Sequence, residues 1–217
     1  MKKLEVTFFW FRRDLRLEDN VGLFHALQSK YPVIPLFIFD ENILDSLPKN
    51  DARVGFIHES LSKINNQLKE SGSSLLIKKG KPQEVWTNLL EEYTIREVIW
   101  NKDYEPSAIQ RDAAVAEILQ SKAIKVLATK DQVIFEKDEV LSLSNKPYSV
   151  FSPYKNAHLK KLNDFYLKPY SVDRYIHNLA KCSPSEFISL EDMGFERTNL
   201  SSMRLPTSMS GGKQLFE

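Results

Sequence analysis

Short apolar runs alternate with stretches of helical apolar spacing through the first 130 residues, and no other feature limits the possible folds so strongly. Five runs rich in β-branched and aromatic residues predict strands at 4–11, 33–39, 74–77, 97–100 and 124–128. Apolar stripes predict four helices between them, at Leu23 to Leu27, Ile57 to Leu68, Trp86 to Tyr93 and Val115 to Leu119. Right-handed crossovers then place helices on both faces of one sheet. The sequence therefore predicts an α/β fold with a doubly wound five-stranded parallel sheet over residues 1–130.

Residues that favour helix starts stand where the apolar stripes begin. Asp19 or Asn20 is placed to cap the first helix, and Asp51 the second. Pro82 and Pro106 suit the first turns of the third and fourth helices, where a missing amide hydrogen costs nothing. Capping residues and apolar spacing therefore predict the same helix boundaries.

Beyond residue 130 the alternation ends. A helical stretch is predicted at 151–162, and the segment 182–212 carries serines and prolines with few apolar residues. We expect residues 131–217 to form a connector without a core of its own.

Composition argues against several classes of function. The 30 lysines and arginines nearly balance 29 acidic residues, which argues against binding nucleic acid by charge alone. The single cysteine, Cys182, cannot form a disulfide within the chain, and the four histidines match no zinc motif, so we expect no metal site. No secretory signal and no apolar run of membrane-spanning length is present, so we expect a cytoplasmic protein without membrane contact.

Polar residues follow the predicted strands at the edge where open parallel sheets bind ligands. They combine guanidinium donors with carboxylate and amide groups, and an aromatic ring stands close by in the second strand. This combination suits a flat heteroaromatic ligand with hydrogen-bonding edges. The candidate binding residues are Arg12, Phe37, Asp40, Arg53, Asn101, Asp103 and Glu105.

The same residues also have a structural interpretation. Charged groups such as Arg12 and Asp103 are typical of loop caps and helix starts, and Trp10, Trp86 and Trp100 are more typical of a core. The chain has no Gly-x-Gly-x-x-Gly after its first strand, no Gly-x-Ser-x-Gly and no convincing pair of nucleophile and base. We therefore expect no catalytic residue in this chain.

One segment, residues 10–20 (WFRRDLRLEDN), resembles the amino-terminal signature of the DNA photolyase and cryptochrome family. Further similar segments follow in the family's order at 36–40 (LFIFD), 52–54 (ARV), 80–82 (GKP), 100–106 (WNKDYEP) and 148–155 (YSVFSPYK). They cover most of residues 5–162. One departure is His158, where many members have tryptophan.

The resemblance implies a role in a larger protein. In that family the α/β domain holds an antenna chromophore, which passes excitation to FAD in a helical domain that repairs pyrimidine dimers with light. Residues 1–130 would be the antenna-chromophore-binding domain, and residues 131–217 a connector leading to a helical FAD domain absent from this chain. Residues 211–217 resemble the opening of that helical half. We therefore expect a monomeric photolyase fragment that is not catalytic alone and meets pyrimidine-dimer DNA only through the full-length protein.

The resemblance also bears on the identity of the antenna. Folate-binding members carry an Asn-Glu pair where this chain has Ser107 and Ala108, which disfavours folate. Members that bind 8-hydroxy-5-deazaflavin or a flavin are more similar to this chain. In such a site Phe37 would stack on the ring system, Arg53 or Arg12 would donate to its carbonyl edge, and Asp40 or Asp103 would accept.

Three alternatives stay open. The same domain could belong to a cryptochrome blue-light photoreceptor, in which light changes partner binding. It could be a stand-alone nucleotide-binding module, or an α/β domain that has lost its antenna and only buttresses the flavin domain.

Overall fold

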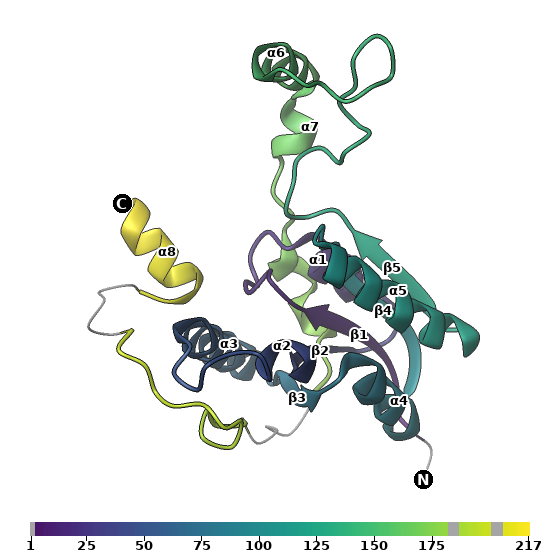
Figure 1. Cartoon of the computed structure of the whole chain (residues 1–217). Helices are drawn as coiled ribbons and strands as arrows, with labels where there is room; N and C mark the ends of the chain where they lie inside the picture. The colour runs from purple at the N-terminus through teal and green to yellow at the C-terminus, as the bar shows by residue number, and fades with distance from the viewer. Residues whose placement is uncertain (1–2, 182–186, 201–205) are drawn as a thin grey trace.

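The computed structural model describes residues 3–181, 187–200 and 206–217, and these residues build a five-stranded sheet (Figure 1). Its strands pair in parallel in the order β3-β2-β1-β4-β5, so the chain extends the sheet first on one side of β1 and then on the other. The predicted doubly wound sheet is confirmed. The strands are β1 (Glu5–Phe11), β2 (Val33–Asp40), β3 (Leu76–Gly80), β4 (Thr94–Asn101) and β5 (Lys125–Thr129).

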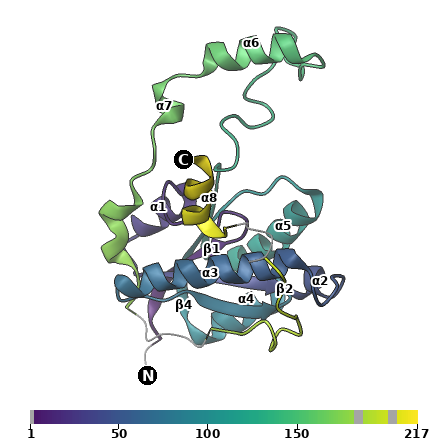
Figure 2. The ribbon, with the colours of Figure 1, turned by 90° about the vertical axis from the view of Figure 1, so that its left-hand side faces the viewer.

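Helices cover both faces of the sheet (Figure 2). α1 (Val21–Leu27) and α3 (Ala52–Glu70) pack on the face where Phe9 and Phe11 are buried. α4 (Pro82–Glu92) and α5 (Pro106–Ser121) pack on the other, against Phe8 and Trp10. Successive residues of β1 thus enter different cores, which is why this strand is apolar throughout rather than at alternate positions. A short helix, α2 (Glu41–Leu44), follows β2 directly.

The helix starts lie where the capping residues predict them. The side chain of Asn20 accepts a hydrogen bond from Leu23 N and caps α1. Asp51 caps α3 in the same way, and Pro82 and Pro106 occupy the first turns of α4 and α5. Of the two candidate caps for α1, Asn20 is therefore the one used. Asp19 has a positive φ of 45° and instead accepts from the backbone nitrogen of Tyr170.

After β5 the chain leaves the sheet and later returns to its α1–α3 face. The 3-10 helix η1 (Val172–Asn178) lies beside α1, and Ala180 N donates to Val33 O at 2.8 Å. We call residues 172–181 and 187–195 the return segment. Four of its apolar side chains are buried in the core on that face. They are Val172, Leu179, Met193 and Phe195. Part of the expected connector thus completes the core of the α/β domain. The boundary between an antenna domain and a connector at residue 130 stays a prediction.

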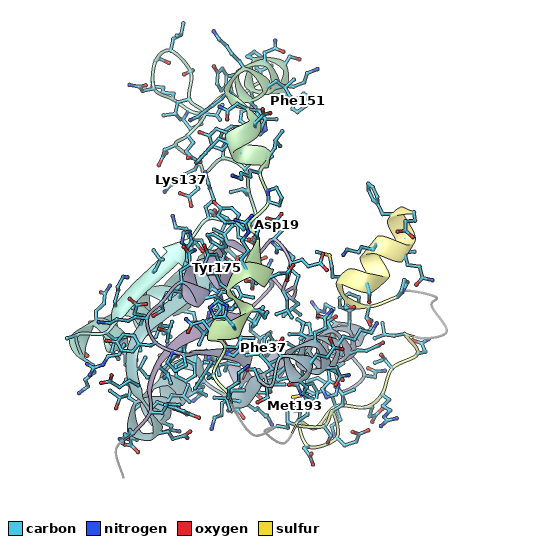
Figure 3. All side chains as sticks on the ribbon, turned by 180° about the vertical axis from the view of Figure 1, so that it is seen from behind. Asp19, Phe37, Lys137, Phe151, Tyr175 and Met193 are labelled. Atoms are coloured by element: carbon cyan, nitrogen blue, oxygen red, sulfur yellow. The ribbon has the colours of Figure 1, made fainter. Side chains whose placement is uncertain are left out.

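Residues 131–171 extend from the sheet as an arm, with Phe151 near its outer end (Figure 3). Its outer part consists of α6 (Phe151–Lys161), close to the predicted 151–162, and α7 (Asp164–Leu167). Phe135 is buried at its base, with the rings of His158 and Tyr166 edge-on at 4.8 and 4.7 Å. His158 therefore has an aromatic packing partner.

The last described helix, α8 (Ser208–Phe216), lies over α3 (Figure 2). Among the described residues, none of the helices has the length and apolar character needed to cross a membrane. Cys182 lies outside the described residues.

Candidate functional site at the carboxyl edge of the sheet

The strand order reverses beside β1, and the carboxyl ends of β1, β2 and β4 meet at this point. Phe11 pairs with Phe37 across β1 and β2, and Phe9 pairs with Ile99 across β1 and β4. The topology therefore brings the predicted binding residues to one edge, where crevices for ligands form in open α/β sheets. How each side chain is used there depends on the loop of residues 12–20.

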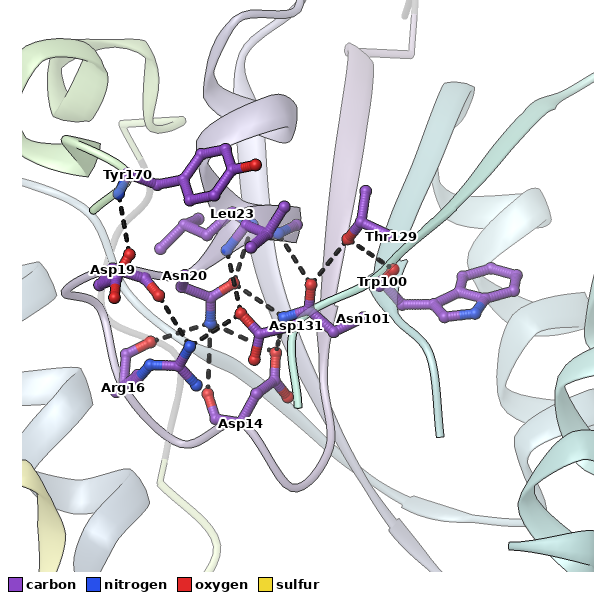
Figure 4. Close-up of polar contacts among 12 residues, drawn as sticks. Asp14, Arg16, Asp19, Asn20, Leu23, Trp100, Asn101, Thr129, Asp131 and Tyr170 are labelled. Carbon is purple, nitrogen blue, oxygen red and sulfur yellow. Dashed lines mark hydrogen bonds and ion pairs between the residues drawn. The ribbon is translucent and has the colours of Figure 1, made fainter. Parts of the chain in front are cut away.

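Asn101 lies at the centre of a buried hydrogen-bond network beneath this loop (Figure 4). Its Oδ1 accepts from Gly22 N at 2.8 Å and from Thr129 Oγ1 at 2.7 Å. Its Nδ2 donates to Asp14 Oδ2 at 2.5 Å and to Asn20 Oδ1 at 2.9 Å. Because an amide offers two donors and two acceptor positions, Asn101 has no capacity left for a ligand. Its role in this structure is to join β4 to the loop and to the start of α1.

Arg12 lies just beyond the end of β1, and its side chain is only 7% exposed. Its guanidinium donates to the carboxylate of Asp112 and to the backbone oxygen of Asn101. The Cζ atom lies over Trp10 at 5.2 Å and over Trp100 at 5.8 Å from the ring centres. Burial lowers the pKa of Arg12, while the charge and hydrogen bond of Asp112 oppose this shift. Arg12 thus faces inward and holds the loop to β4 and α5.

Charged residues on the β4 side form a group that we call the β4 rim, consisting of Arg13, Asp103 and Glu105. The side chains of Arg13 and Glu105 are about half exposed, and that of Asp103 is buried. Arg13 Nε lies 3.1 Å from Asp103 Oδ2, and its Nη2 lies 2.5 Å from Glu105 Oε2. The hydrogen bond that Arg13 donates to Glu105 raises the pKa of Arg13. Asp103 also accepts from Glu105 N, which fixes the turn into α5. Arg13 is not among the binding residues predicted from the sequence, although Arg13 stands beside Arg12 in the same motif.

A second group, the β2 rim, consists of Asp40 and Arg53. Asp40 caps α2 by accepting from Asn42 N at 3.0 Å, and it remains partly exposed. Arg53 pairs with Asp51 at 2.6 Å at the start of α3, and its side chain is 73% exposed. Hydrogen bonds from Arg53 lower the pKa of Asp51. Both rim residues therefore present polar atoms to solvent.

Phe37 is buried just below the β2 rim. It is 7% exposed and packs edge-on against Phe39, with ring centres 4.9 Å apart. Within the described residues, no hydrogen bond or ion pair joins the β2 rim to the β4 rim. The structure thus gathers the seven candidates at one edge of the sheet. Arg12, Asn101 and Phe37 are used internally, and the two rims lie one after β2 and one after β4.

A cavity of about 470 Å³, lined by none of these candidates, lies between residues 15–18 of the loop, α3, η1 and α8. Its apolar lining includes Leu15, Leu17 and Met209, and its polar lining includes Gln67 and Asp173. The sequence offered no signal for it, because two of its four walls come from helices that the apolar pattern does not reveal.

The strand order and the helices on both faces define a doubly wound α/β domain. The family model described as DNA photolyase matches residues 7–172, and the chain belongs to the DNA photolyase family. A deoxyribodipyrimidine photo-lyase from Synechococcus is 35% identical over 193 residues, covering 87% of this chain and 40% of that protein. Cryptochrome-2 of Gallus gallus is 30% identical over 64% of this chain and 24% of its own length.

Solved photolyase structures share the fold. A class III photolyase from Agrobacterium tumefaciens superposes with a TM-score of 0.80 at 24% identity, covering 99% of this chain and 44% of that one. An archaeal photolyase from Sulfolobus tokodaii, described with two FAD molecules and a novel light-harvesting cofactor, gives 0.64 at 27% identity over 84% of this chain and 43% of its own. The chain therefore spans less than half the length of these photolyases, and the match is to their N-terminal α/β domain.

Proposed function

We propose that this chain is the part of a deoxyribodipyrimidine photolyase that holds a light-harvesting chromophore, at the carboxyl edge of the sheet. The observation that carries the proposal is the position of the two exposed rims beside the strand-order reversal, in a chain of the DNA photolyase family. The whole protein would repair pyrimidine dimers in DNA with light. FAD and a helical domain would supply the chemistry, and this chain would supply none of the reacting groups.

The residues of the edge fit a flavin-like ring system at the rims better than deeper in the sheet. Arg12 and Asn101 have their polar atoms satisfied within the protein, so their proposed role is to hold the loop in place. Arg53 and Asp40 can bind the hydrogen-bonding edge of a ring from the β2 side, and Arg13 and Glu105 from the β4 side. The side chain of Asp103 is only 6% exposed and holds Arg13 in place. Phe37 can support the floor only after a shift of its ring, because it is nearly covered.

The proposed chromophore is 8-hydroxy-5-deazaflavin or a flavin rather than a folate. Such a group, when bound, absorbs light and passes the excitation on. Ala108, at the first turn of α5, is only 5% exposed, and its side chain has no polar atom, so it offers no side-chain hydrogen bond where folate-binding members have one. The guanidinium of Arg53, by contrast, lies at the start of a 19-residue helix whose N-terminus adds partial positive charge.

Cryptochromes among the relatives support a second candidate, a chromophore-holding domain of a blue-light photoreceptor. We favour the photolyase because the photolyase from Synechococcus is more similar to this chain and covers more of it. In either case we propose that the chain acts as a monomer in the cytoplasm, beside a helical FAD domain and, for a photolyase, pyrimidine-dimer DNA.

A dark fluorescence titration tests the proposal. The purified chain is titrated with 8-hydroxy-5-deazaflavin, FMN, FAD and a reduced folate at one salt concentration. We expect saturable binding of a flavin-type chromophore, weakened about tenfold by Arg53→Ala, because a charge-assisted hydrogen bond is lost. Arg96→Ala is the matched control, since Arg96 is also an exposed arginine in an ion pair, with Glu5 at the opposite end of the sheet. Equal weakening by both substitutions, or no effect of Arg53→Ala on measurable binding, would contradict the proposed site.

A further inference from the structure

Three tryptophans form a buried cluster directly behind the carboxyl edge. Trp10 contacts Trp86 and Trp100 edge-on, with ring centres 5.8 and 5.7 Å apart. All three are at most 2% exposed, which confirms the expectation that they belong to the core. Indole is among the most readily oxidised side chains, so such a cluster beside a light-absorbing molecule would normally be a source of electrons.

Two guanidinium groups lie against the central tryptophan. Arg12 Cζ is 5.2 Å and Arg111 Cζ is 5.3 Å from the ring centre of Trp10. Both arginines bind the same carboxylate, that of Asp112, and their side chains are only 7% and 17% exposed. Among the described residues no other carboxylate forms an ion pair with either guanidinium. Asp14, the next carboxylate, accepts from the backbone of Arg12 and from the amides of Asn20 and Asn101.

The hydrogen bonding of the indole nitrogens also affects how easily the cluster is oxidised. Trp10 Nε1 and Trp86 Nε1 are buried and have no hydrogen-bond acceptor within the described part of the chain. An oxidised indole is commonly stabilised by losing its N–H proton to a neighbouring acceptor. Here no neighbour is placed to take that proton from Trp10, so the oxidised state gains nothing from deprotonation.

We propose that Arg12 and Arg111 keep Trp10 from donating an electron to a light-excited chromophore, so that the excitation is preserved for transfer. The suppressed step would move one electron from the Trp10 indole to the excited heteroaromatic chromophore, leaving an indole radical cation and a chromophore reduced by one electron. The new positive charge would lie within 5.3 Å of two guanidinium carbons, so two attractive cation–π contacts would become repulsive. The benefit to light harvesting rests on the proposed function, whereas the electrostatic effect on Trp10 does not.

Arg111 is the residue to change, because Asp112 keeps Arg12 as its partner when Arg111 is replaced. Arg111→Met retains much of the side-chain length and removes the charge together with the hydrogen bonds to Asp112. Arg96→Met is the matched control, since Arg96 pairs with Glu5 and makes no cation–π contact with a tryptophan. Trp10→Phe in the Arg111→Met background identifies the ring that loses the electron. Circular dichroism of each variant checks that the fold is retained.

The experiment is flash oxidation of the full chain, without any antenna, by a water-soluble ruthenium photo-oxidant with a sacrificial electron acceptor. We expect the transient absorbance of the tryptophan radical to rise about threefold in Arg111→Met, to stay unchanged in Arg96→Met, and to return to the wild-type level when Trp10→Phe is added. An unchanged radical yield in Arg111→Met, or a gain that survives Trp10→Phe, would overturn the proposal. Because no chromophore is needed, failure of chromophore binding would count against the proposed function alone.

If a chromophore binds, its fluorescence lifetime gives a second readout. Electron transfer from Trp10 would compete with emission, so we expect a shorter lifetime in Arg111→Met than in the wild type and the Arg96→Met control. An equal lifetime in all three chains, together with normal binding, would show that Arg111 does not protect the excited state.

Discussion

At the scale of single residues, Arg12 links three parts of the edge with one guanidinium. It binds the carboxylate of Asp112 in α5, the backbone of β4 and the faces of two indoles. Burial of a charge is tolerated here because its hydrogen bonds are made within the protein. The same inward orientation explains why Arg12 holds the loop of residues 12–20 instead of facing solvent.

Arg12→Met is therefore expected to lower the free energy of unfolding by about 2–4 kcal/mol, because it leaves a backbone oxygen without its donor and weakens the pairing of a half-buried carboxylate. Urea denaturation followed by tryptophan fluorescence measures the change. Arg96→Met serves again as control and should leave the urea midpoint nearly unchanged, since its ion pair is exposed. Equal midpoints for the two variants would show that Arg12 is not a structural anchor.

The amino-acid sequence predicted which residues lie at the carboxyl edge of the sheet, but not which groups their side chains bind there. A cap at Asp19 or Asn20 follows from local rules, because a capping side chain bonds a backbone nitrogen two or three residues away, and the structure shows that Asn20 is the one used. The saturation of Asn101 could not be predicted, since its partners Asp14 and Thr129 lie far along the chain and meet it only after the sheet forms. For the same reason the residues after β1 gave no indication of which guanidinium faces solvent.

At the scale of elements, the return segment around η1 is hydrogen-bonded to the chain between α1 and β2. The amide of Asn178 donates to the backbone oxygens of Leu27, Ser29 and Tyr31 at 3.1, 2.7 and 3.3 Å. These carbonyls lie between the end of α1 and the start of β2, where no regular structure would satisfy them. One side chain thus closes the turn between two elements.

We expect Asn178→Ala to lower the free energy of unfolding by about 1–2 kcal/mol, because several carbonyls lose their donor. Native-state hydrogen exchange should report the loss at Ala180, whose backbone nitrogen bonds Val33 O. Asn66→Ala, an exposed asparagine of α3, is the control that should not alter exchange at Ala180. If Ala180 exchanges equally slowly in both variants, the return segment is held by its apolar contacts alone.

The base of the arm is a second element-level feature, and its ion pairs predict a pH response. Hydrogen bonds from Lys102 and Lys130 lower the pKa values of Glu136 and Glu139, and Tyr104, whose own pKa is raised to about 12, also donates to Glu136. Because these carboxyl groups have lower pKa values in the folded state, the stabilisation is complete above their unfolded value of 4.5 and is lost as the pH falls through the folded values.

Acidification from pH 6 to pH 3 should therefore loosen the arm before the sheet unfolds. Limited proteolysis by pepsin between pH 4.5 and pH 3, where this protease is active, should begin to cut near residues 131–145 in the wild type as the pH falls. A Glu136→Gln and Glu139→Gln double variant should be cut there already at the highest pH tested. If cleavage of the arm depends on pH in the same way in the wild type and the double variant, groups other than Glu136 and Glu139 cause the loosening.

At the scale of the whole molecule, the sheet is complete at Thr129 but its core is not. The apolar periodicity predicted a doubly wound parallel sheet with helices on both faces, because the apolar spacing repeats within each strand and each helix. It did not predict that Val172, Leu179, Met193 and Phe195 return to cover the α1–α3 face, since isolated apolar residues in an irregular segment carry no period.

A chain ending at residue 130 should therefore be less stable than a chain ending at residue 200. Burying four such side chains contributes on the order of 5 kcal/mol or more, and their loss would expose the core of the α1–α3 face. Thermal unfolding of the two truncated chains and the full chain measures the difference. We expect the chain ending at 200 to melt close to the full chain, and equal melting of all three would mean that the return segment adds nothing.

The most direct test of the central claim is a crystal structure of this chain with the chromophore that the titration identifies. We predict electron density at the carboxyl edge, with the ring edge within hydrogen-bond distance of Arg53 or of Arg13 and its carboxylates. Density in the cavity between α3, η1 and α8, or a bound chromophore that contacts neither rim, would contradict the account.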